Sequence, residues 1–310
     1  MLRRIGLGPS AGAPVPPASN PSYLVVGHVA KDLTPSGPRL GGTAAYAALT
    51  ARALGYTPAL VTACDNDLDL TPLDGLDIAA TPSPTSTTFE NIYRPEGRRQ
   101  YLRARAPVLS IACVPSALRS AAIVHVGPIA GEVPTDLVEA LASAGNFLGL
   151  TPQGWMRRWA GDGQVYPSNW ADAFSLLPLA SAVVLSLEDL QGDWGVAQSW
   201  SQVAKVLVVT LGAGGCTVFS QGQPEKHVPA PEVTEVDPTG AGDVFAAAFF
   251  TRLHETQSPS AAAEFANRIA AVSVTRPGLA GIPSAAEARA LSADEVRLGS
   301  REPAANRARR

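Results

Sequence analysis

The residue types best suited to chemistry stand together in one segment, Asp237–Asp243, which reads DPTGAGD and runs directly into the apolar stretch VFAAAFFTRLHE. That stretch is typical of a buried helix, so the glycines are expected at a helix N-terminus, where free N–H groups and the positive dipole end attract anions. Gly240 and Gly242 lack a Cβ and let a phosphate approach the backbone. Asp243 can accept a proton from a hydroxyl while the N–H groups hold a phosphoryl group in transit. The alternative is a glycine-rich turn with a capping aspartate and no catalytic role. An isolated GxGD motif would favour that alternative.

Other short segments carry residues that bind ligands only if the fold brings them together. Gly41 and Gly42 open a run of small residues, Asp32 lies just after the first expected strand, and Gly212 and Gly215 lie at the end of a later strand and in the turn after it. Taken singly, these are more often a plain loop, a solvated strand end and a tight turn.

The elements that must position these residues alternate along the chain. Near-continuous apolar runs predict strands that are covered on both faces, and they lie at 22–29, 58–64, 121–129, 146–150, 182–187 and 205–212. Amphipathic helices are predicted at 44–55, ending at Gly55, and at 135–144, capped by Thr135. This alternation predicts an α/β fold with a mainly parallel sheet.

The segment 85–104 breaks this pattern. It alternates β-forming and polar residues and predicts an antiparallel hairpin, Thr85–Tyr93 and Arg98–Ala104, with a turn at Pro95–Gly97. A polar hairpin inserted in a parallel α/β domain is expected to project from the body, as active-site lids do.

Composition excludes several classes of function. The 310 residues carry a net charge of −3 and include 16% charged residues. The chain therefore lacks the surplus of basic residues that would indicate a nucleic-acid partner. No run of about 18 apolar residues predicts a membrane span, and three scattered cysteines predict neither a disulfide framework nor a zinc site. A cytoplasmic protein is therefore expected. We expect one domain over residues 22–296, with a disordered tail at 1–21 and a flexible tail at 297–310.

Five segments, in order, resemble the PfkB or ribokinase-like carbohydrate kinase family. They are VVGHVAKD ending at Asp32, LGGTAAYAA with Gly41 and Gly42, TLGAGG at 210–215, DPTGAGD ending at Asp243, and VTRPG at 274–278. The resemblance covers about residues 23–283. It implies a three-layer α/β/α fold with a small β-hairpin lid, and phosphoryl transfer from ATP, with Mg²⁺, to a hydroxyl of a sugar, cyclitol or nucleoside.

The resemblance also implies roles for individual residues. Asp243 is the expected base, and the backbone of Gly240, Ala241 and Gly242, with the Asp243 N–H, forms the anion hole. The expected nucleotide-binding residues are Thr210, Gly212, Gly215 and Asn267. The expected acceptor-binding residues are Asp32, Gly41, Gly42, Tyr46, Glu132 and Arg157. Asp189 is expected to reach the metal through a water molecule, and dependence on a monovalent cation is left open.

The chain departs from the family pattern at three places. Ser186 and Asp189 stand where members often carry Asn and Glu near the metal, and Tyr46 stands where ribokinase-like members often carry Asn. The link from Asp32 to Gly41 is short, so the lid is expected to come mainly from the 85–104 hairpin. The segment 149–157, which contains Gln153 and Arg157, is similar to a region of myo-inositol-kinase-like members.

Two functions remain open at this point. One is a kinase that acts on a polyol, with a cyclitol expected before ribose. The other is a catalytically silent ligand-binding protein on the same fold, which the replacement of Asn by Ser186 permits. A monomer or weak homodimer is expected, because the short Asp32–Gly41 link leaves no room for the extra lid strands through which members dimerise.

Overall fold

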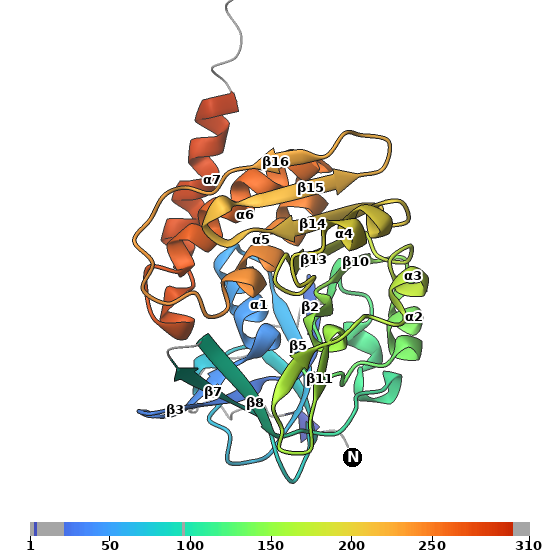
Figure 1. Cartoon of the computed structure of the whole chain (residues 1–310), viewed down its shortest axis with the longest axis vertical. Helices are drawn as coiled ribbons and strands as arrows, with labels where there is room; N and C mark the ends of the chain where they lie inside the picture. Colours follow the sequence, from blue (N-terminus) through green and yellow to red (C-terminus); the bar gives the residue numbers. More distant parts are fainter. Residues whose placement is uncertain (1–2, 5–21, 95–96, 300–310) are drawn as a thin grey trace, which may run out of the picture.

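The structure is a computed structural model that describes residues 3–4, 22–94 and 97–299. A ten-stranded sheet runs through the molecule, and helices cover both of its faces (Figure 1). In spatial order its strands are β1 (Arg3–Arg4), β6 (Asp77–Pro82), β5 (Pro58–Cys64), β2 (Tyr23–Val26), β9 (Ile123–Val126), β10 (Phe147–Leu150), β13 (Ala182–Ser186), β14 (Val206–Thr210), β15 (Cys216–Ser220) and β16 (Lys226–Val228). Neighbours from β6 to β14 pair in parallel, while β1, β15 and β16 pair antiparallel.

Alternate residues of the buried strands point into two separate cores. In β2, Tyr23 and Val25 face one core, and Leu24 and Val26 face the other. The first core contains side chains of α1 (Gly42–Ala53), α5 (Ala241–Thr256), α6 (Pro259–Ser273) and α7 (Ala285–Gly299), and the second contains those of α2 (Thr135–Ala142), α3 (Ala173–Leu176) and α4 (Trp194–Ser201). The predicted three-layer α/β/α fold is confirmed.

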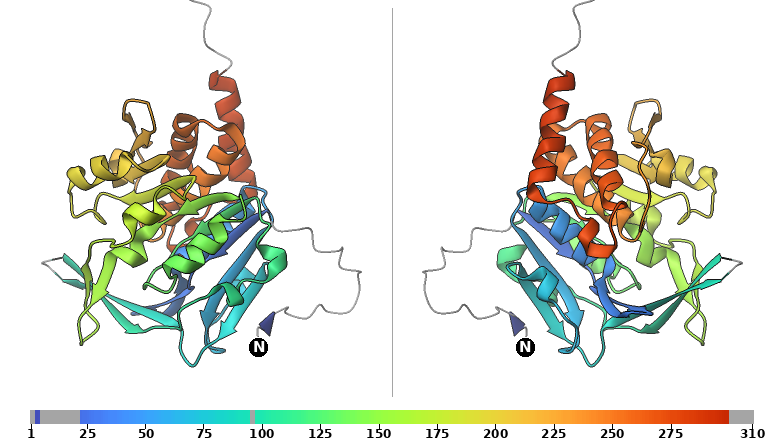
Figure 2. Two further views of the ribbon diagram at one scale, coloured as in Figure 1. Left: turned by 90° about the vertical axis from the view of Figure 1, so that its right-hand side faces the viewer. Right: turned by 90° about the vertical axis from the view of Figure 1, so that its left-hand side faces the viewer.

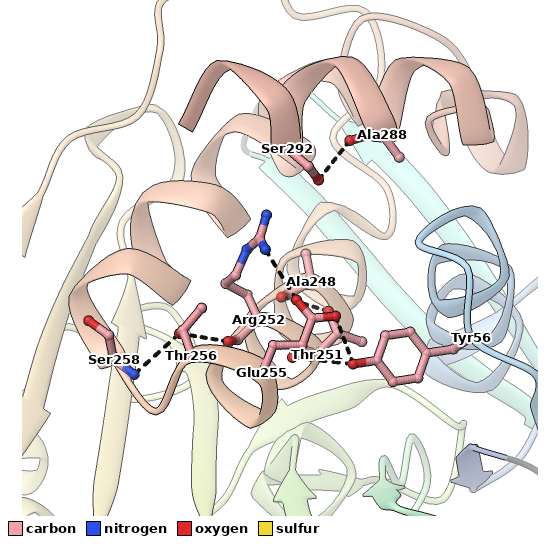
Figure 3. A network of polar contacts seen from close by, with 9 residues as sticks. All are labelled: Tyr56, Ala248, Thr251, Arg252, Glu255, Thr256, Ser258, Ala288 and Ser292. Atoms are coloured by element: carbon pink, nitrogen blue, oxygen red, sulfur yellow. Dashed lines mark hydrogen bonds and ion pairs between the residues drawn. The ribbon is translucent and has the colours of Figure 1, made fainter. Parts of the chain in front are cut away.

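A polar network holds the C-terminal end of α5 (Figure 3). The Tyr56 hydroxyl, which follows α1, donates a hydrogen bond to Glu255 at 3.0 Å, and Glu255 also pairs with Arg252 at 3.1 Å. Because α5 is otherwise apolar and its middle is buried, these contacts tie the helix to its neighbour at the end opposite Asp243.

A second, smaller sheet projects from the body (Figure 2). Its four strands lie in the order β4 (Gly37–Gly41), β3 (Ala30–Thr34), β7 (Thr87–Arg94) and β8 (Gly97–Ala104). The predicted hairpin lid is therefore confirmed as β7 and β8, although residues 95–96 of its predicted turn lie outside the described residues. We call this four-stranded sheet the lid.

The prediction that the link from Asp32 to Gly41 is too short for strands is wrong. The link lies within the β3–β4 hairpin, whose turn needs only Pro35 and Ser36, and β3 also pairs in parallel with β7. The link thus contributes half of the lid. The expected monomer or weak homodimer stays a prediction, now without that support.

A further hairpin, β11 (Arg157–Trp159) and β12 (Val165–Pro167), braces the outer strand of the lid. The Leu102 N–H donates to the Gly163 carbonyl at 2.8 Å, and a Cβ at Gly163 would collide with the Leu102 backbone. Tyr101 also bridges to Gln164. The edge of β8 is therefore covered rather than open.

Two local predictions need correction. Helix α2 has Pro134 as its N-cap, and Thr135 donates its hydroxyl to Asp172 at 3.0 Å instead of capping the helix. The expected tails lie mostly outside the described residues, but Arg3–Arg4 pairs with β6, and α7 continues to Gly299, three residues into the expected C-terminal tail. In the part of the chain that the structure describes, no helix is both long and apolar enough to cross a membrane.

Candidate active site

The N-terminus of α5 presents unbonded backbone N–H groups beside Asp243. Gly240 is the N-cap with φ +77°, a left-handed conformation that favours glycine. The Ala241 N–H donates to the Pro238 carbonyl at 3.1 Å, whereas no acceptor is found among the described residues for the N–H groups of Gly242 and Asp243. The predicted anion hole therefore loses the N–H of Ala241. A Cβ built on Gly242 would meet nothing within 4 Å, so the space in front of these amides is open.

The Asp243 carboxylate lies among groups that shift its pKa in opposite directions. Poor hydration raises the pKa to about 6, and the charges of Asp189 and Asp32 also raise it. The Thr43 hydroxyl, which donates to Oδ1 at 2.6 Å, and the Arg157 guanidinium lower it. A carboxylate with a pKa near 6 is ionised at neutral pH and still basic enough to take up a proton.

Asp237, at the other end of the same loop, is bound by backbone amides. It accepts hydrogen bonds from the N–H groups of Thr239 and Gly278, each at 2.9 Å. These bonds outweigh the partial burial and lower the pKa of Asp237. Asp237 thus joins the loop before α5 to the loop after α6.

Tyr46, from α1, covers the α5 N-terminus from the lid side. A Cβ at Gly240 would collide with the Tyr46 ring, so only glycine lets the loop and the ring approach this closely. Burial raises the pKa of Tyr46, as do the charges of Asp243, Asp237 and Asp32, so its hydroxyl stays protonated. The predicted acceptor-binding position Tyr46 therefore lies between the three carboxylates.

A cavity of about 1190 Å³ opens between the lid and the body, beside this loop. Its lining includes Asp32 and Tyr46, and Gly41 lies against Asp32, since a Cβ there would collide with the Asp32 carboxylate. Gly42 has φ +84° and touches the backbone of residues 28–30. The charged residues that line the cavity are Asp32, Asp67, Asp69, Glu90 and Asp237, with Lys31 and Arg39 as the cations.

Glu132 holds backbone in place and does not line this cavity. It is fully buried, and its carboxylate accepts from the N–H groups of His28 at 2.9 Å, Ile129 at 3.0 Å and Ala130 at 2.7 Å. The expected contact between Glu132 and the acceptor is therefore not supported. A buried carboxylate satisfied by backbone amides is a structural element.

His28, next to Glu132, ties together the three chain segments at the base of the lid. Its Nε2 lies 3.0 Å from the Pro107 carbonyl, which can only accept, so Nε2 carries the proton and Nδ1 accepts from the Thr87 hydroxyl at 2.7 Å. Thr87 in turn accepts from the Ala106 N–H at 3.1 Å. The lid therefore joins the body through a fully bonded, buried cluster.

The residues expected to bind the nucleotide come from the end of β14, the glycine-rich turn that follows it and α6. Gly212 has φ +57° and no neighbour near its Cβ position, while a Cβ at Gly215 would collide with the backbone of residues 228–230. Asn267 is buried and donates to the carbonyls of Val228 at 3.0 Å and Pro229 at 3.2 Å. Asn267 and Gly215 thus fix the chain after β16, and the Asn267 amide is already engaged. Thr210 ends β14, half-buried.

Comparison with known proteins decides the family. A family model described as "pfkB family carbohydrate kinase" matches residues 113–285, more than half of the chain. This chain belongs to the pfkB family of carbohydrate kinases.

Three curated relatives show how far the similarity extends. A mouse (Mus musculus) ribokinase is 46% identical over 77 residues, which cover 24% of each chain. Rice (Oryza sativa subsp. japonica) fructokinase-1 is 26% identical over 245 residues, 71% of this chain and 72% of that one. Maize (Zea mays) inositol 3-kinase is 32% identical over 153 residues, 49% of this chain and 39% of that one.

Two solved structures share the fold. A pyrophosphate-dependent kinase of the ribokinase family, complexed with a pyrophosphate analogue and myo-inositol, has a TM-score of 0.70 at 23% identity, with 83% of this chain and 96% of that chain covered. Arabidopsis thaliana ribokinase, complexed with ribose and ATP, has a TM-score of 0.66 at 18% identity, with 88% and 99% covered.

In this pfkB-family chain, Asp189 forms a polar group behind the Asp243 site. Its Oδ2 accepts from the N–H of Ser186 at 2.9 Å and from the Ser186 hydroxyl at 2.8 Å, while Gln153 lies 3.4 Å from Oδ1. Oδ1 thus keeps capacity for another ligand, and a carboxylate oxygen suits Mg²⁺ or its water. Ser186 therefore orients Asp189, the residue expected near the metal.

Arg157 lies between the lid and the Asp243 carboxylate. Its guanidinium lies over the ring of Phe89, a β7 residue, at 5.7 Å, and its charge acts on Asp243. The sequence indicated Arg157, whereas Thr43 carried no signal of its own, since a threonine in a small-residue helix is ordinary.

Proposed function

We propose that this chain transfers the terminal phosphoryl group of ATP to a hydroxyl of an uncharged polyol, a sugar or a cyclitol. The observation that carries the proposal is Asp243, a carboxylate with a pKa of about 6 beside the unbonded N–H groups of Gly242 and Asp243. A ligand-binding protein without catalysis has no use for a base at this place.

The residues divide the reaction between them. The acceptor hydroxyl gives its proton to the Asp243 carboxylate as its oxygen forms a bond to the γ-phosphorus, and the bond from that phosphorus to the bridging oxygen breaks to release ADP. The two amides and the dipole of α5 stabilise charge on the phosphoryl group in transit. Asp189 would hold Mg²⁺ through a water molecule, and the ion would neutralise phosphate charge there. Arg157 adds a positive charge from the lid side.

The lining of the cavity supports a neutral acceptor. Five carboxylates face two cations there, so an acceptor that already carries a phosphate would be repelled. Carboxylate, amide and phenol groups such as Asp32, Asn91 and Tyr46 suit the hydroxyls of a polyol. The Tyr46 ring fills the space above Gly240, so we propose a cyclitol before ribose.

The donor is a separate question. The open backbone at Gly212 and the glycine-rich turn after β14 support a nucleotide, and Arabidopsis ribokinase has been solved with ATP. A pyrophosphate-dependent kinase of similar fold is known, however, so pyrophosphate is the competing donor. Both would place a phosphoryl group at the N–H groups of Gly242 and Asp243.

The test is a matrix of donors and acceptors. ATP and pyrophosphate, each with Mg²⁺, are combined with myo-inositol, ribose, fructose, adenosine and fructose 6-phosphate, and product phosphate esters are measured directly. We expect ATP with myo-inositol to give the highest kcat/KM, and fructose 6-phosphate to fall well below fructose. Turnover with pyrophosphate but not with ATP would overturn ATP as the proposed donor. A kcat/KM for ribose or adenosine tenfold above that for myo-inositol would overturn the proposed acceptor. No turnover with any pair of donor and acceptor would favour the catalytically silent binding protein.

A further inference from the structure

Thr43 is the second residue of α1 and reaches the catalytic carboxylate from 200 positions away in the chain. It is only 2% exposed, and its hydroxyl donates to Oδ1 of Asp243 at 2.6 Å. A hydroxyl that donates to a carboxylate at this distance forms a charge-assisted hydrogen bond. Among the described residues, no second hydrogen bond to the Asp243 carboxylate is found, so Oδ2 remains for the substrate.

The other branch of the Thr43 side chain is wedged against the sheet. Its methyl group lies where a Cβ on Gly127 would be, and the Thr151 hydroxyl borders the same spot. Thr151 lies 3.0 Å from Nε2 of His125, whose Nδ1 lies 3.0 Å from the hydroxyl of Tyr23, and all of these groups are buried. The methyl group therefore rests on a rigid surface and fixes the direction of the hydroxyl.

We propose that Thr43 is a positioning residue for the general base. Its hydroxyl holds Oδ1 of Asp243, so that Oδ2 faces the acceptor hydroxyl, and its methyl group, seated at Gly127, fixes the rotamer in which it does so. The inference rests on the proposed function, because it assigns Asp243 the role of base.

The same bond opposes the groups that raise the pKa of Asp243. The charged or titratable groups that face Asp243 are Asp32 from the lid, Asp189 after β13, Arg157 from β11 and Tyr46 from α1. Of these, both aspartates raise the pKa of Asp243 and Arg157 lowers it, so the loss of the Thr43 bond should move the pKa upward.

Two pairs of variants separate the hydroxyl from the methyl group. Thr43→Val keeps the shape and loses the hydroxyl, and Thr43→Ser keeps the hydroxyl and loses the methyl group. Thr43→Ala and Thr43→Ser form a second pair, which differs in the hydroxyl alone and decides the matter if Thr43→Val does not fold. For each, kcat is measured from pH 5 to 9, and the Asp243 carboxyl is titrated by ¹³C NMR in the protein without substrates.

We expect Thr43→Val to raise the pKa of the Asp243 carboxyl by about one unit, which places kcat at pH 6 about elevenfold below the variant's own plateau, against about twofold for wild type. The plateau should fall by about tenfold, with KM for both substrates within about threefold of wild type, since the base is misdirected while binding is retained. Thr43→Ser should keep the wild-type pH profile.

Other outcomes are distinct from these. If Thr43→Val keeps the wild-type pH profile and plateau while Thr43→Ser is impaired, the hydroxyl does not hold Oδ1 of Asp243 and the positioning role is overturned. If the wild type transfers no phosphoryl group, the proposed function fails, yet the NMR titration still decides whether Thr43 controls Asp243. An unchanged carboxyl titration in Thr43→Val and Thr43→Ala would overturn the inference by itself.

Discussion

Replacing Asp243 by Asn should abolish turnover and stabilise the protein, with a gain that grows from about pH 4 and is nearly complete at about pH 6. The pKa of Asp243 rises from 3.8 to about 6 on folding, so the folded protein holds this proton more tightly than the unfolded chain. Stability is therefore lost as pH rises from 3.8 through 6, and at pH 8 the ionised carboxylate costs at most about 3 kcal/mol. Because Asp243 is partly exposed, water screens its charge, and we expect an actual cost of about 1–3 kcal/mol.

Asp243→Asn removes this cost, since an amide is neutral at every pH and its Oδ1 can still accept from Thr43. Thermal unfolding without ligands should show a melting temperature roughly 2–5 °C above wild type at pH 8, and only about a fifth of this gain at pH 4. The rate should fall on the order of 10²–10⁴-fold. An equal gain at both pH values, or no gain at pH 8, would refute the assignment of a raised pKa.

Asp237→Asn is the matched control, because it is the same substitution in the same loop with the opposite expected sign. The folded pKa of Asp237 is lowered, so its ionised form stabilises the protein above the unfolded pKa. The Asn variant should be destabilised at pH 8 by about 1 kcal/mol, less than the full value of a hydrogen bond to a charged group because Asp237 is partly exposed, and the difference should shrink as pH falls. A gain in stability at pH 8 would contradict the bonds to Thr239 and Gly278.

Three further predictions concern the anion hole, the base and the buried carboxylate. Gly242→Val should weaken donor binding by at least about tenfold while the melting temperature stays near wild type. Gly161→Val is the control, because a Cβ there also meets nothing within 4 Å, and it should leave donor binding unchanged. Equal effects of the two variants on donor binding would contradict the anion hole. The kcat of the wild type should rise with pH through an acidic limb near pH 6, the pKa of Asp243, and a limb near pH 4 would exclude this carboxylate as the base. Glu132→Ala should destabilise the fold by about 3–5 kcal/mol in denaturant unfolding, because three buried N–H groups lose their acceptor. Glu132→Gln should leave KM for the acceptor substrate within about threefold of wild type. A larger rise in this KM would restore Glu132 to the acceptor site.

Much of the fold could be predicted because the sheet is buried on both faces. A strand of this kind must be apolar on both sides, so β5, β9, β10, β13 and β14 each appear in the sequence as an apolar run. The start of α5 was predictable for a different reason, since only a glycine-rich turn can bring backbone amides to a phosphate.

The lid was only half predicted, because β3 and β4 carry little apolar pattern. Their residues are only partly buried and their turn has two residues, so the segment has the pattern of a polar link. What makes them strands is pairing with β7, about 57 residues away in the chain, for example Ala30 with Thr87. Propensity within a short window carries no information about such a partner.

The roles of individual side chains were harder to predict than the elements that carry them. Glu132 was expected at the acceptor only from the family resemblance, but its carboxylate accepts hydrogen bonds from backbone N–H groups. Thr43 showed no signal, since its importance comes entirely from the approach of α1 to α5. Both cases depend on contacts between segments distant in sequence.

The two ends of the Asp237–Asp243 segment explain how one short loop can be both firm and reactive. Asp237 is satisfied by two backbone N–H groups, so it prefers to be charged and pins the loop to residue 278. Asp243 meets two other carboxylates and little water, so its charge is costly. A loop that was not pinned could relax by turning Asp243 toward solvent, which would restore an ordinary pKa and a weaker base. The bonds of Asp237 and the Tyr46 ring against Gly240 prevent that relaxation. Under the proposed function, the free-energy cost of holding Asp243 ionised is what prepares it to take up a proton.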